Sequence, residues 1–248
     1  MHRPSISRRD YLRFLGSLGA LSTLGATTSL NPTFAQGSQI KPDAKSVLIV
    51  VDVQNCFMPG GTLPVKQGDE IVPIINRLAK AFDNVVITQD WHTPGHASFA
   101  SAHGGKKPFE MTKLAYGDQV LWPDHCVQGT PDAAVHKDID IPHTQLVIRK
   151  GYRKGIDSYS AFMEADRKTK TGLAGYLKAR NITTCYCVGL ATDFCVGWTA
   201  LDARKEGFQA TVIEDACRAI DLNGSLAKAW AEMQKAGVKR MQSTAFVS

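Results

Sequence analysis

Uninterrupted apolar runs constrain the fold of this chain more than any other feature. Residues 46–51 read Ser-Val-Leu-Ile-Val-Val, with no polar side chain after the first serine. Such a run is typical of a strand buried on both faces of a parallel sheet, because helices cover both sides of that sheet. Further segments have strand-like composition, at 84–89, 145–149, 182–188, 209–213 and the short 238–242.

Amphipathic helical patterns lie between these runs. Apolar residues recur on one helical face over 71–82, and similar patterns predict helices at 173–180 and 226–236. Alternating strands and helices predict an α/β fold with right-handed crossovers. We expect three layers: a doubly wound, Rossmann-like and mainly parallel sheet of about six strands, with helices on both faces.

One domain is expected over residues 45–248, after a linker at 36–44 that is rich in Gly, Ser, Gln and Pro. The periodic pattern loosens between residues 91 and 143, where Gly, Pro, His and Trp are frequent. A long irregular stretch inside a compact domain is usually functional. The sequence therefore predicts that this stretch contributes to a site.

The N-terminal segment 1–35 resembles a twin-arginine export signal. It carries Arg8 and Arg9, then an apolar run over 14–30, and a small residue, Ala35, at the predicted cleavage site. The apolar run is short and contains Gly, Ser and Thr, so no stable membrane anchor is expected. We therefore predict a periplasmic protein, with the twin-arginine export machinery as a partner.

The net charge argues against a nucleic-acid partner. Removal of residues 1–35 takes away four Arg and one Asp, so the net charge falls from +6 to about +3. No cluster of Lys and Arg with interleaved aromatic residues is present in the sequence. No nucleic-acid binding is expected.

A reactive thiol is predicted in the segment 189–196, Gly-Leu-Ala-Thr-Asp-Phe-Cys-Val. Read as a strand-to-helix turn, with Thr192 or Asp193 as the N-cap, this segment places Cys195 in the first turn of a helix. Unpaired backbone N–H groups and the helix dipole there favour a thiolate and can hold an oxyanion. The alternative is that Cys195 is a small buried apolar residue.

The six cysteines are expected to be mostly free thiols. Cys185 and Cys187 alternate in one predicted strand, about 7 Å apart at Cα, which is marginal for a disulfide. A folded-export route also means that folding is complete before the chain meets an oxidising compartment.

Charged residues end three of the predicted strands: Asp52, Asp90 and Lys150. Sites in parallel α/β sheets lie beyond the carboxyl ends of the strands, so these side chains should meet the Cys195 turn. Asp52 can then act as a base for the thiol, and Lys150 can orient both groups.

A metal site is predicted beside them. Asp90 and His92 are two residues apart, and His125 can supply a third ligand, with His96 as a further candidate. This donor set suits zinc, iron or manganese, so one divalent metal ion is expected. The remaining histidines are assigned structural roles: His103, His136 and His143.

The sequence resembles the nicotinamidases, also called pyrazinamidases, of the isochorismatase-like cysteine hydrolase superfamily. The matching segments span nearly the whole predicted domain: 52–57 (Asp-Val-Gln-Asn-Cys-Phe), 89–92 (Gln-Asp-Trp-His), 98–100 (Ser-Phe-Ala), 122–130 (Trp-Pro-Asp-His-Cys-Val-Gln-Gly-Thr), 150–151 (Lys-Gly) and 189–196. The resemblance implies an isochorismatase-like fold and hydrolysis of nicotinamide, with pyrazinamide as a further substrate, through a cysteine thioester.

Site residues follow from the same resemblance. It implies the triad Asp52, Lys150 and Cys195, the metal ligands Asp90, His92 and His125, a cis peptide at Leu190–Ala191, and an oxyanion hole from the amides of Ala191 and Cys195. It also implies aromatic walls from Phe57 and Trp122, with Tyr159 as a further pocket residue. The expected ligand is a small aromatic amide, and a homo-oligomer is a further expectation.

One residue departs from the family pattern, and two alternatives stay open. Cys56 stands where the family usually has a second aspartate, as a neutral neighbour or as a thiol that affects redox sensitivity. The first alternative is a metal-independent N-carbamoyl or other amide hydrolase with the same triad. The second is a periplasmic metal-binding or thiol redox protein, although no Cys-x-x-Cys is present in the sequence.

Overall fold

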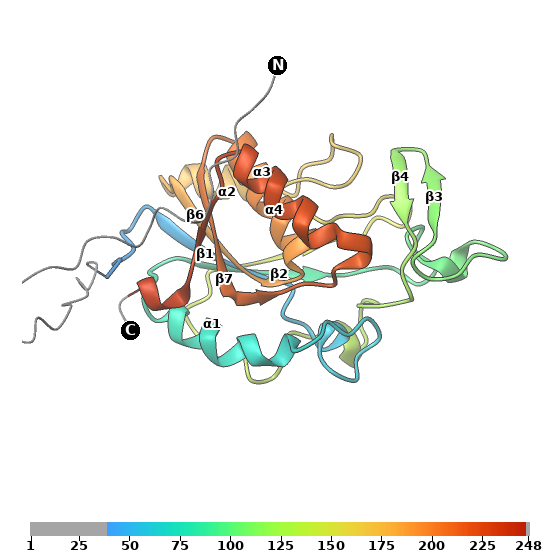
Figure 1. Ribbon diagram of the computed structural model, residues 1–248, viewed down its shortest axis with the longest axis horizontal. Helices are drawn as coiled ribbons and strands as arrows, with labels where there is room; N and C mark the ends of the chain where they lie inside the picture. Colours follow the sequence, from blue (N-terminus) through green and yellow to red (C-terminus); the bar gives the residue numbers. More distant parts are fainter. Residues whose placement is uncertain (1–38, 247–248) are drawn as a thin grey trace, which may run out of the picture. The chain divides into compact units, whose positions relative to one another are not determined.

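A six-stranded parallel sheet forms the centre of the domain in the computed structural model, which describes residues 39–246 (Figure 1). The strand order is β5-β2-β1-β6-β7-β8, and every pairing is parallel. The strands are β1 (Ser46–Val51), β2 (Val85–Asp90), β5 (Leu146–Lys150), β6 (Thr184–Leu190), β7 (Gln209–Arg218) and β8 (Lys239–Met241). The predicted doubly wound fold is confirmed, whereas the predicted export signal lies outside the described residues.

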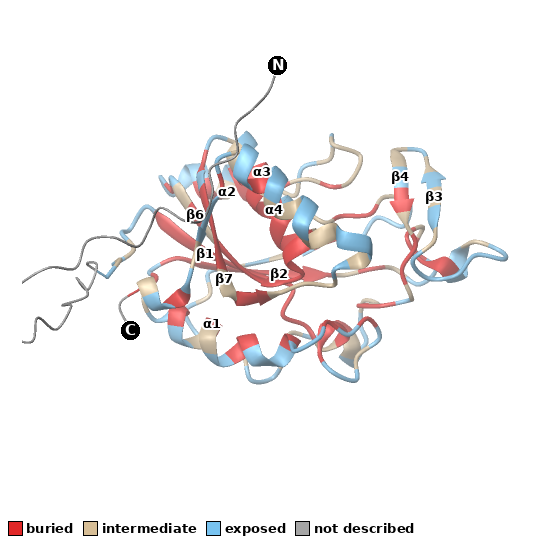
Figure 2. Ribbon diagram, viewed as in Figure 1, coloured by how far each residue is buried: buried red, intermediate tan, exposed pale blue. Residues whose placement is uncertain are grey.

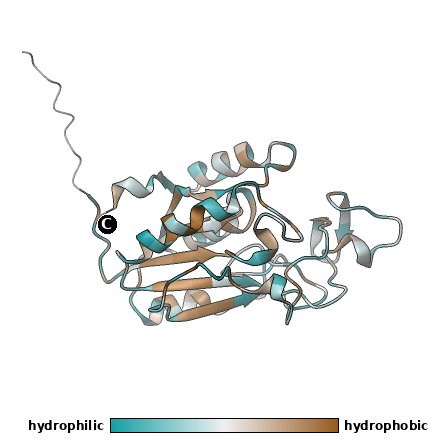
Figure 3. Ribbon diagram, turned by 90° about the horizontal axis from the view of Figure 1, so that it is seen from below, coloured by the Kyte–Doolittle hydropathy of each residue, from teal (hydrophilic) through white to brown (hydrophobic). Residues whose placement is uncertain are grey.

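Helices cover both faces of this sheet and complete three layers (Figure 1). One face packs on α1 (Val72–Ala79), and the other packs on α2 (Leu173–Ala179), α3 (Gly197–Lys205) and α4 (Ser225–Lys235). On the central strands, the buried and the hydrophobic parts coincide (Figures 2 and 3).

The continuous apolar run of β1 serves both layers. Val47, Ile49 and Val51 belong to the core beneath α2, α3 and α4. Leu48 and Val50 belong to the core beneath α1. Because successive side chains of a strand point to opposite faces, a strand between two helical layers needs apolar residues at every position.

Two elements differ from the sequence prediction. The strand predicted at 209–213 continues to Arg218, because the polar segment after Ile213 pairs with the end of β6 beyond a register shift. The stretch 91–143 contains an antiparallel hairpin of β3 (Met111–Leu114) and β4 (Gly117–Val120). These strands are short and half-exposed, so their composition gave no strand signal.

The strand order reverses between β1 and β6, which lie side by side at the centre of the sheet. Their close approach depends on Gly189, whose φ is +112°, because a Cβ added at this position would lie 2.0 Å from the Val51 carbonyl oxygen. Parallel sheets bind ligands at such a reversal, beyond the carboxyl ends of the strands.

The predicted linker is partly attached to the domain. Ile40 forms a parallel bridge with Phe246, and its backbone N–H donates to the Ala245 carbonyl at 2.7 Å. Within residues 39–246, no helix has the length and apolar character needed to cross a membrane.

Candidate active site

Four predicted site residues meet at the carboxyl edge of the sheet. Asp52 follows β1, and Cys195 lies in the turn after β6, on the two sides of the strand-order reversal. Asp90 and Lys150 end β2 and β5 and are paired in register. The fold therefore places the thiol, both carboxylates and the ammonium group together, as the strand-end positions predict.

Lys150 is the centre of this group. Its side chain is fully buried, and its Nζ lies 2.7 Å from Asp52 Oδ2 and in a short ion pair with Asp90 Oδ1. Nζ also donates to the Ser158 carbonyl at 3.1 Å and to Cys195 Sγ at 3.3 Å. Burial lowers the pKa of Lys150, but the two carboxylates outweigh it and raise that pKa well above its ordinary value. The ammonium group is therefore charged.

Asp52 is held by a threonine that the sequence analysis did not select. Thr88 Oγ1 donates to Asp52 Oδ1 at 2.5 Å and accepts the Asp52 backbone N–H at 3.1 Å. Burial raises the pKa of Asp52, and the Lys150 charge opposes that rise. Thr88 stands two residues before Asp90 in β2, so it shares a face with Asp90, and that spacing was the available signal.

The expected thiolate at Cys195 is not supported. Cys195 is only 6% exposed, and burial raises the pKa of its thiol well above the ordinary value, with Lys150 opposing and the two carboxylates adding to the rise. The environment of a first helical turn is too weak to offset removal of the sulfur from water. The thiol therefore needs a base within reach, and an Asp52 oxygen lies within 4.8 Å of its sulfur.

The turn that carries the thiol is π-helical, over Thr192–Val196, and leads into α3. The predicted N-cap is wrong: among residues 39–246, no side chain caps this turn. Asp193 instead accepts from the backbone N–H groups of Ile220 and Asp221, at 3.1 and 2.8 Å, and from Ser225. These bonds tie the turn to the start of α4. The Leu190–Ala191 peptide is cis, as predicted.

A three-residue donor set lies beside the triad. His92 Nε2 and His125 Nε2 are 3.7 and 3.8 Å from Asp90 Oδ2. The Nδ1 atoms contact backbone carbonyls, of Gly151 at 3.0 Å and of Pro123 at 2.8 Å. Each ring therefore carries its proton on Nδ1 and presents the Nε2 lone pair toward Asp90, which is the arrangement of metal-binding histidines. These residues fit a divalent metal ion.

Gly151 makes room for this arrangement. Its φ is +67°, and a Cβ at this position would lie 2.6 Å from the His92 ring. The carbonyl of Gly151 can accept the His92 proton only because the ring packs directly on the backbone. The Lys-Gly pair at 150–151 thus supplies both the ammonium group and the support of a histidine.

His96 is next to the cluster but differs in its bonding. Its Nδ1 accepts from Ser98, with Oγ at 2.8 Å and the backbone N–H at 3.2 Å. Its Nε2 lies 3.0 Å from the Arg153 carbonyl and 3.2 Å from that of Ile156. With both nitrogens engaged, His96 holds a loop and has no lone pair directed at Asp90. Other predicted structural histidines likewise bond to backbone carbonyls: His103 to Ala97 and His143 to Ala79.

Cys195 contributes to the lining of a pocket at this edge of the sheet. The predicted residues Phe57, Trp122 and Tyr159 line it, and the Tyr159 hydroxyl accepts from Trp122 Nε1 at 3.0 Å. Four further lining residues were not predicted: Leu63, Asp157, Phe194 and Ile220. Aromatic walls with a few polar groups at one end suit a flat, singly substituted ring.

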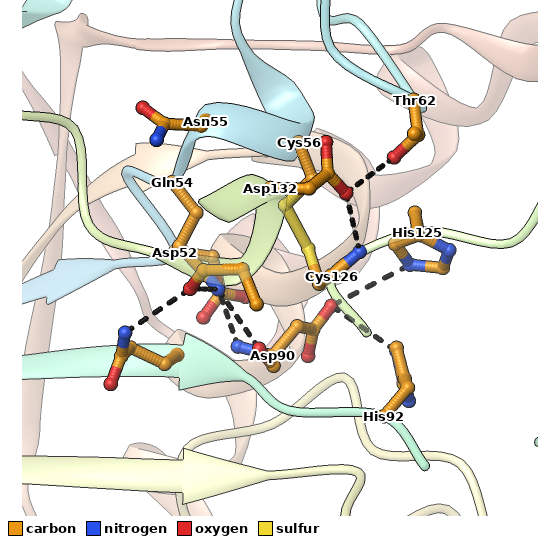
Figure 4. The surroundings of a disulfide bond; sticks show 12 residues. Asp52, Gln54, Asn55, Cys56, Thr62, Asp90, His92, His125, Cys126 and Asp132 are labelled. Atoms are coloured by element: carbon orange, nitrogen blue, oxygen red, sulfur yellow. Dashed lines mark hydrogen bonds and ion pairs between the residues drawn. A yellow bond between two sulfur atoms is a disulfide. The ribbon is translucent and has the colours of Figure 1, made fainter. Parts of the chain in front are cut away.

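The prediction of mostly free thiols is wrong for one pair. Cys56 and Cys126 form a disulfide with a Cα–Cα distance of 5.5 Å, so Cys56 is neither a free thiol nor an isolated neighbour (Figure 4). In the described part of the chain the other four cysteines are free and buried. The paired residues are 70 positions apart, and only the tertiary fold brings their loops together.

Comparison with known proteins places the chain in a family. The isochorismatase domain model matches residues 46–245. The nicotinamidase of Acinetobacter baylyi is 61% identical over 205 residues, which are 83% of this chain and 96% of that protein.

Two solved structures are also similar. The nicotinamidase and pyrazinamidase of Acinetobacter baumannii has a TM-score of 0.82 and 63% identity, covering 82% of this chain and 99% of that one. A pyrazinamidase of Pyrococcus horikoshii in complex with zinc has a TM-score of 0.66 and 36% identity, covering 80% and 99%. The chain belongs to the isochorismatase family.

Proposed function

We propose that this protein hydrolyses nicotinamide to nicotinate and ammonia, with Cys195 as the nucleophile. The observation that carries the proposal is the position of the Cys195 thiol. It lies 3.3 Å from Lys150 Nζ, within reach of Asp52, at the base of an aromatic cavity. The nicotinamidase name of the relative at 61% identity supports the same activity.

Asp52 is the proposed base. Its Oδ2 lies 2.7 Å from Lys150 Nζ, and an Asp52 oxygen lies within 4.8 Å of the Cys195 sulfur. As Cys195 attacks the carboxamide carbon, the thiol proton passes to Asp52, and the charge on Lys150 stabilises the resulting ions. The protonated Asp52 then gives this proton to the departing nitrogen, which leaves as ammonia.

Hydrolysis of the thioester completes the reaction. Water attacks the acyl carbon as Asp52 takes a proton from it, and Asp52 then gives this proton to the leaving Cys195 sulfur. The thiol is regenerated, and the released acid ionises to nicotinate. We propose that the backbone N–H groups of Ala191 and Cys195 hold the oxyanion in both steps. Both residues line the cavity, which supports this assignment.

One divalent metal ion, zinc, iron or manganese, is proposed at Asp90, His92 and His125. Bound there, the metal would orient the substrate through its ring nitrogen. The zinc complex of the pyrazinamidase at 36% identity supports a metal in this family. Asp90 would connect the two halves of the site, because its Oδ1 pairs with Lys150 while its Oδ2 faces the histidines.

Phe57, Trp122 and Tyr159 are the proposed ring-binding residues, and pyrazinamide is a proposed further substrate. The apolar walls would accept either aromatic ring, and the name of the relative from A. baumannii includes both activities. Residues 1–35 are proposed to direct export to the periplasm by the twin-arginine route. The predicted homo-oligomer stays a prediction.

Ammonia and nicotinate released from nicotinamide by the purified protein test this function, with and without a chelator. We expect release by the wild type, none by Cys195→Ala, and full release by the control Cys185→Ala, which removes a buried free thiol from the core. Release of ammonia by Cys195→Ala would refute the assignment of Cys195 as the nucleophile. Hydrolysis of an N-carbamoyl substrate, but not of nicotinamide, would favour the alternative activity.

A further inference from the structure

We propose that the Cys56–Cys126 disulfide is a positioning cross-link of the active site, which fixes the metal-ligand loop against the pocket wall. The inference rests on the proposed metal site and pocket. Each cysteine is adjacent in the chain to a proposed site residue. Cys56 directly precedes Phe57, and Cys126 directly follows His125. Cross-linking these two positions therefore fixes the distance between a ring-binding side chain and a metal ligand.

The disulfide is buried behind the site. Both cysteines are fully buried, and Figure 4 shows the sulfur bridge beside Asp90, His92 and His125. The rings of Phe57 and His125, which both line the cavity, are in contact with centroids 5.7 Å apart. The bridge and this ring contact thus connect the same two segments.

Cys126 also joins the two histidine segments. The backbone N–H of His92 donates to the Cys126 carbonyl at 3.0 Å, and the N–H of Gln128 donates to the His92 carbonyl at 2.8 Å. Cys126 has a φ of +45°, a left-handed conformation that is unfavourable for a residue with a side chain. Its position therefore depends on contacts from outside its own loop.

Hydrogen bonds also connect the two loops. Thr62 Oγ1 and the Cys126 N–H both donate to Asp132 Oδ2, at 2.7 and 3.1 Å (Figure 4). Asn55 N–H donates to the Ala134 carbonyl at 3.0 Å. These bonds reach Cys126 only through the Asp132 carboxylate and the segment 132–134, whereas the disulfide joins Cys126 covalently to the residue before Phe57.

The bond requires an oxidant of the disulfide class. Two thiols become one disulfide by losing two protons and two electrons, and an oxidised dithiol partner accepts both and becomes a dithiol. A reduced chain retains Cys56 and Cys126 as thiols and lacks the cross-link. The oxidised and the reduced protein can therefore be compared with no change in sequence.

The test compares the oxidised wild type, its reduced form and the pair variant Cys56→Ala/Cys126→Ala. The matched control is Cys185→Ala/Cys187→Ala, which also removes two buried sulfurs but no disulfide. Peptide mapping by mass spectrometry should find the Cys56 and Cys126 peptides joined in the oxidised protein. Two unlinked thiols at these positions in protein exposed to a disulfide oxidant would overturn the inference.

Zn²⁺ affinity and amide hydrogen exchange then measure how firmly the disulfide positions the metal-ligand loop. We expect Zn²⁺ binding to weaken about 10-fold or more in the pair variant and in the reduced form, since loss of outer support typically costs 10–100-fold. At saturating Zn²⁺, KM for nicotinamide should rise more than kcat falls, because the triad comes from the strand ends. Exchange of the His92 and Cys126 amides should become faster while that of β1 is unchanged.

Unchanged Zn²⁺ affinity, or unchanged exchange of these two amides, would overturn the proposed positioning role of the disulfide. The same loss in the Cys185→Ala/Cys187→Ala control would assign the effect to general loosening and would overturn it as well. If the wild type neither binds Zn²⁺ nor releases ammonia, the proposed function fails, and the exchange comparison still decides whether the disulfide positions the loop.

Discussion

Replacement of Lys150 by methionine removes the only buried ammonium group that the structure places between Asp52 and Asp90 within residues 39–246. Methionine is apolar and of similar length, so the cavity stays filled while both carboxylates lose their counter-ion. Breaking a fully buried ion pair by removing one partner costs about 3–5 kcal/mol, because the remaining charge is uncompensated. A domain of ordinary stability, about 5–15 kcal/mol, should survive this loss in a weakened form.

The loss should depend on pH in a defined direction. Burial already raises the pKa of Asp52 above its ordinary value of 3.8, and removal of the Lys150 charge raises it further. The same charge helps to lower the pKa of Asp90 against the effect of burial, so that pKa also rises in the variant. A carboxyl with a raised folded pKa destabilises the protein only above its unfolded pKa. The deficit should therefore be largest near pH 7.5 and smaller near pH 4.

Urea unfolding of chelator-treated protein at several pH values measures this deficit, with the exposed Lys154→Met as the control. Ammonia release from nicotinamide by Lys150→Met should fall at least about 100-fold, the lower range for loss of acid–base function. A deficit of equal size at pH 4 and pH 7.5 would mean that Lys150 acts by packing alone. Turnover at the wild-type rate would refute its role at the thiol.

Three further changes test the metal site, the pH dependence of stability and the export signal. His92→Ala should lower the metal content measured by elemental analysis, and full occupancy would reject the donor set. Glu164 is buried, and burial raises its pKa to about 7 from 4.5, opposed by Arg153. Its contribution to stability is present below pH 4.5 and is lost as the pH rises to 7. The Glu164→Gln variant should therefore be more stable than the wild type above pH 7 and differ little from it near pH 4. A pH-independent difference in urea unfolding would contradict this. Replacement of Arg8 and Arg9 by Lys should block export, and unchanged periplasmic levels would indicate another route.

Much of the fold was predictable because its physical signals are local. The apolar run of β1 reads as a strand covered on both faces, and the strand-end positions of Asp52, Asp90 and Lys150 follow from that reading. The rule that parallel sheets carry their sites at the carboxyl edge then brings these residues to the Cys195 turn.

Features that depend on distant packing were not predictable in the same way. The Cys56–Cys126 bond joins loops that are 70 residues apart, and the support of Asp52 by Thr88 requires the pairing of β1 with β2. The raised pKa of the Cys195 thiol is also a tertiary effect, since it depends on how deeply the turn is buried. Local sequence indicates which side chains reach the site, but not how strongly water is excluded there.

The proposed reaction requires that Cys195 carries the acyl group during nicotinamide hydrolysis. The most direct measurement is rapid acid quenching of the wild-type protein during turnover, followed by peptide mapping by mass spectrometry. We expect a nicotinoyl group on the peptide that contains Cys195 and on no other cysteine peptide, with none in Cys195→Ala. Steady release of ammonia while the Cys195 peptide stays unmodified, together with turnover by Cys195→Ala, would contradict it.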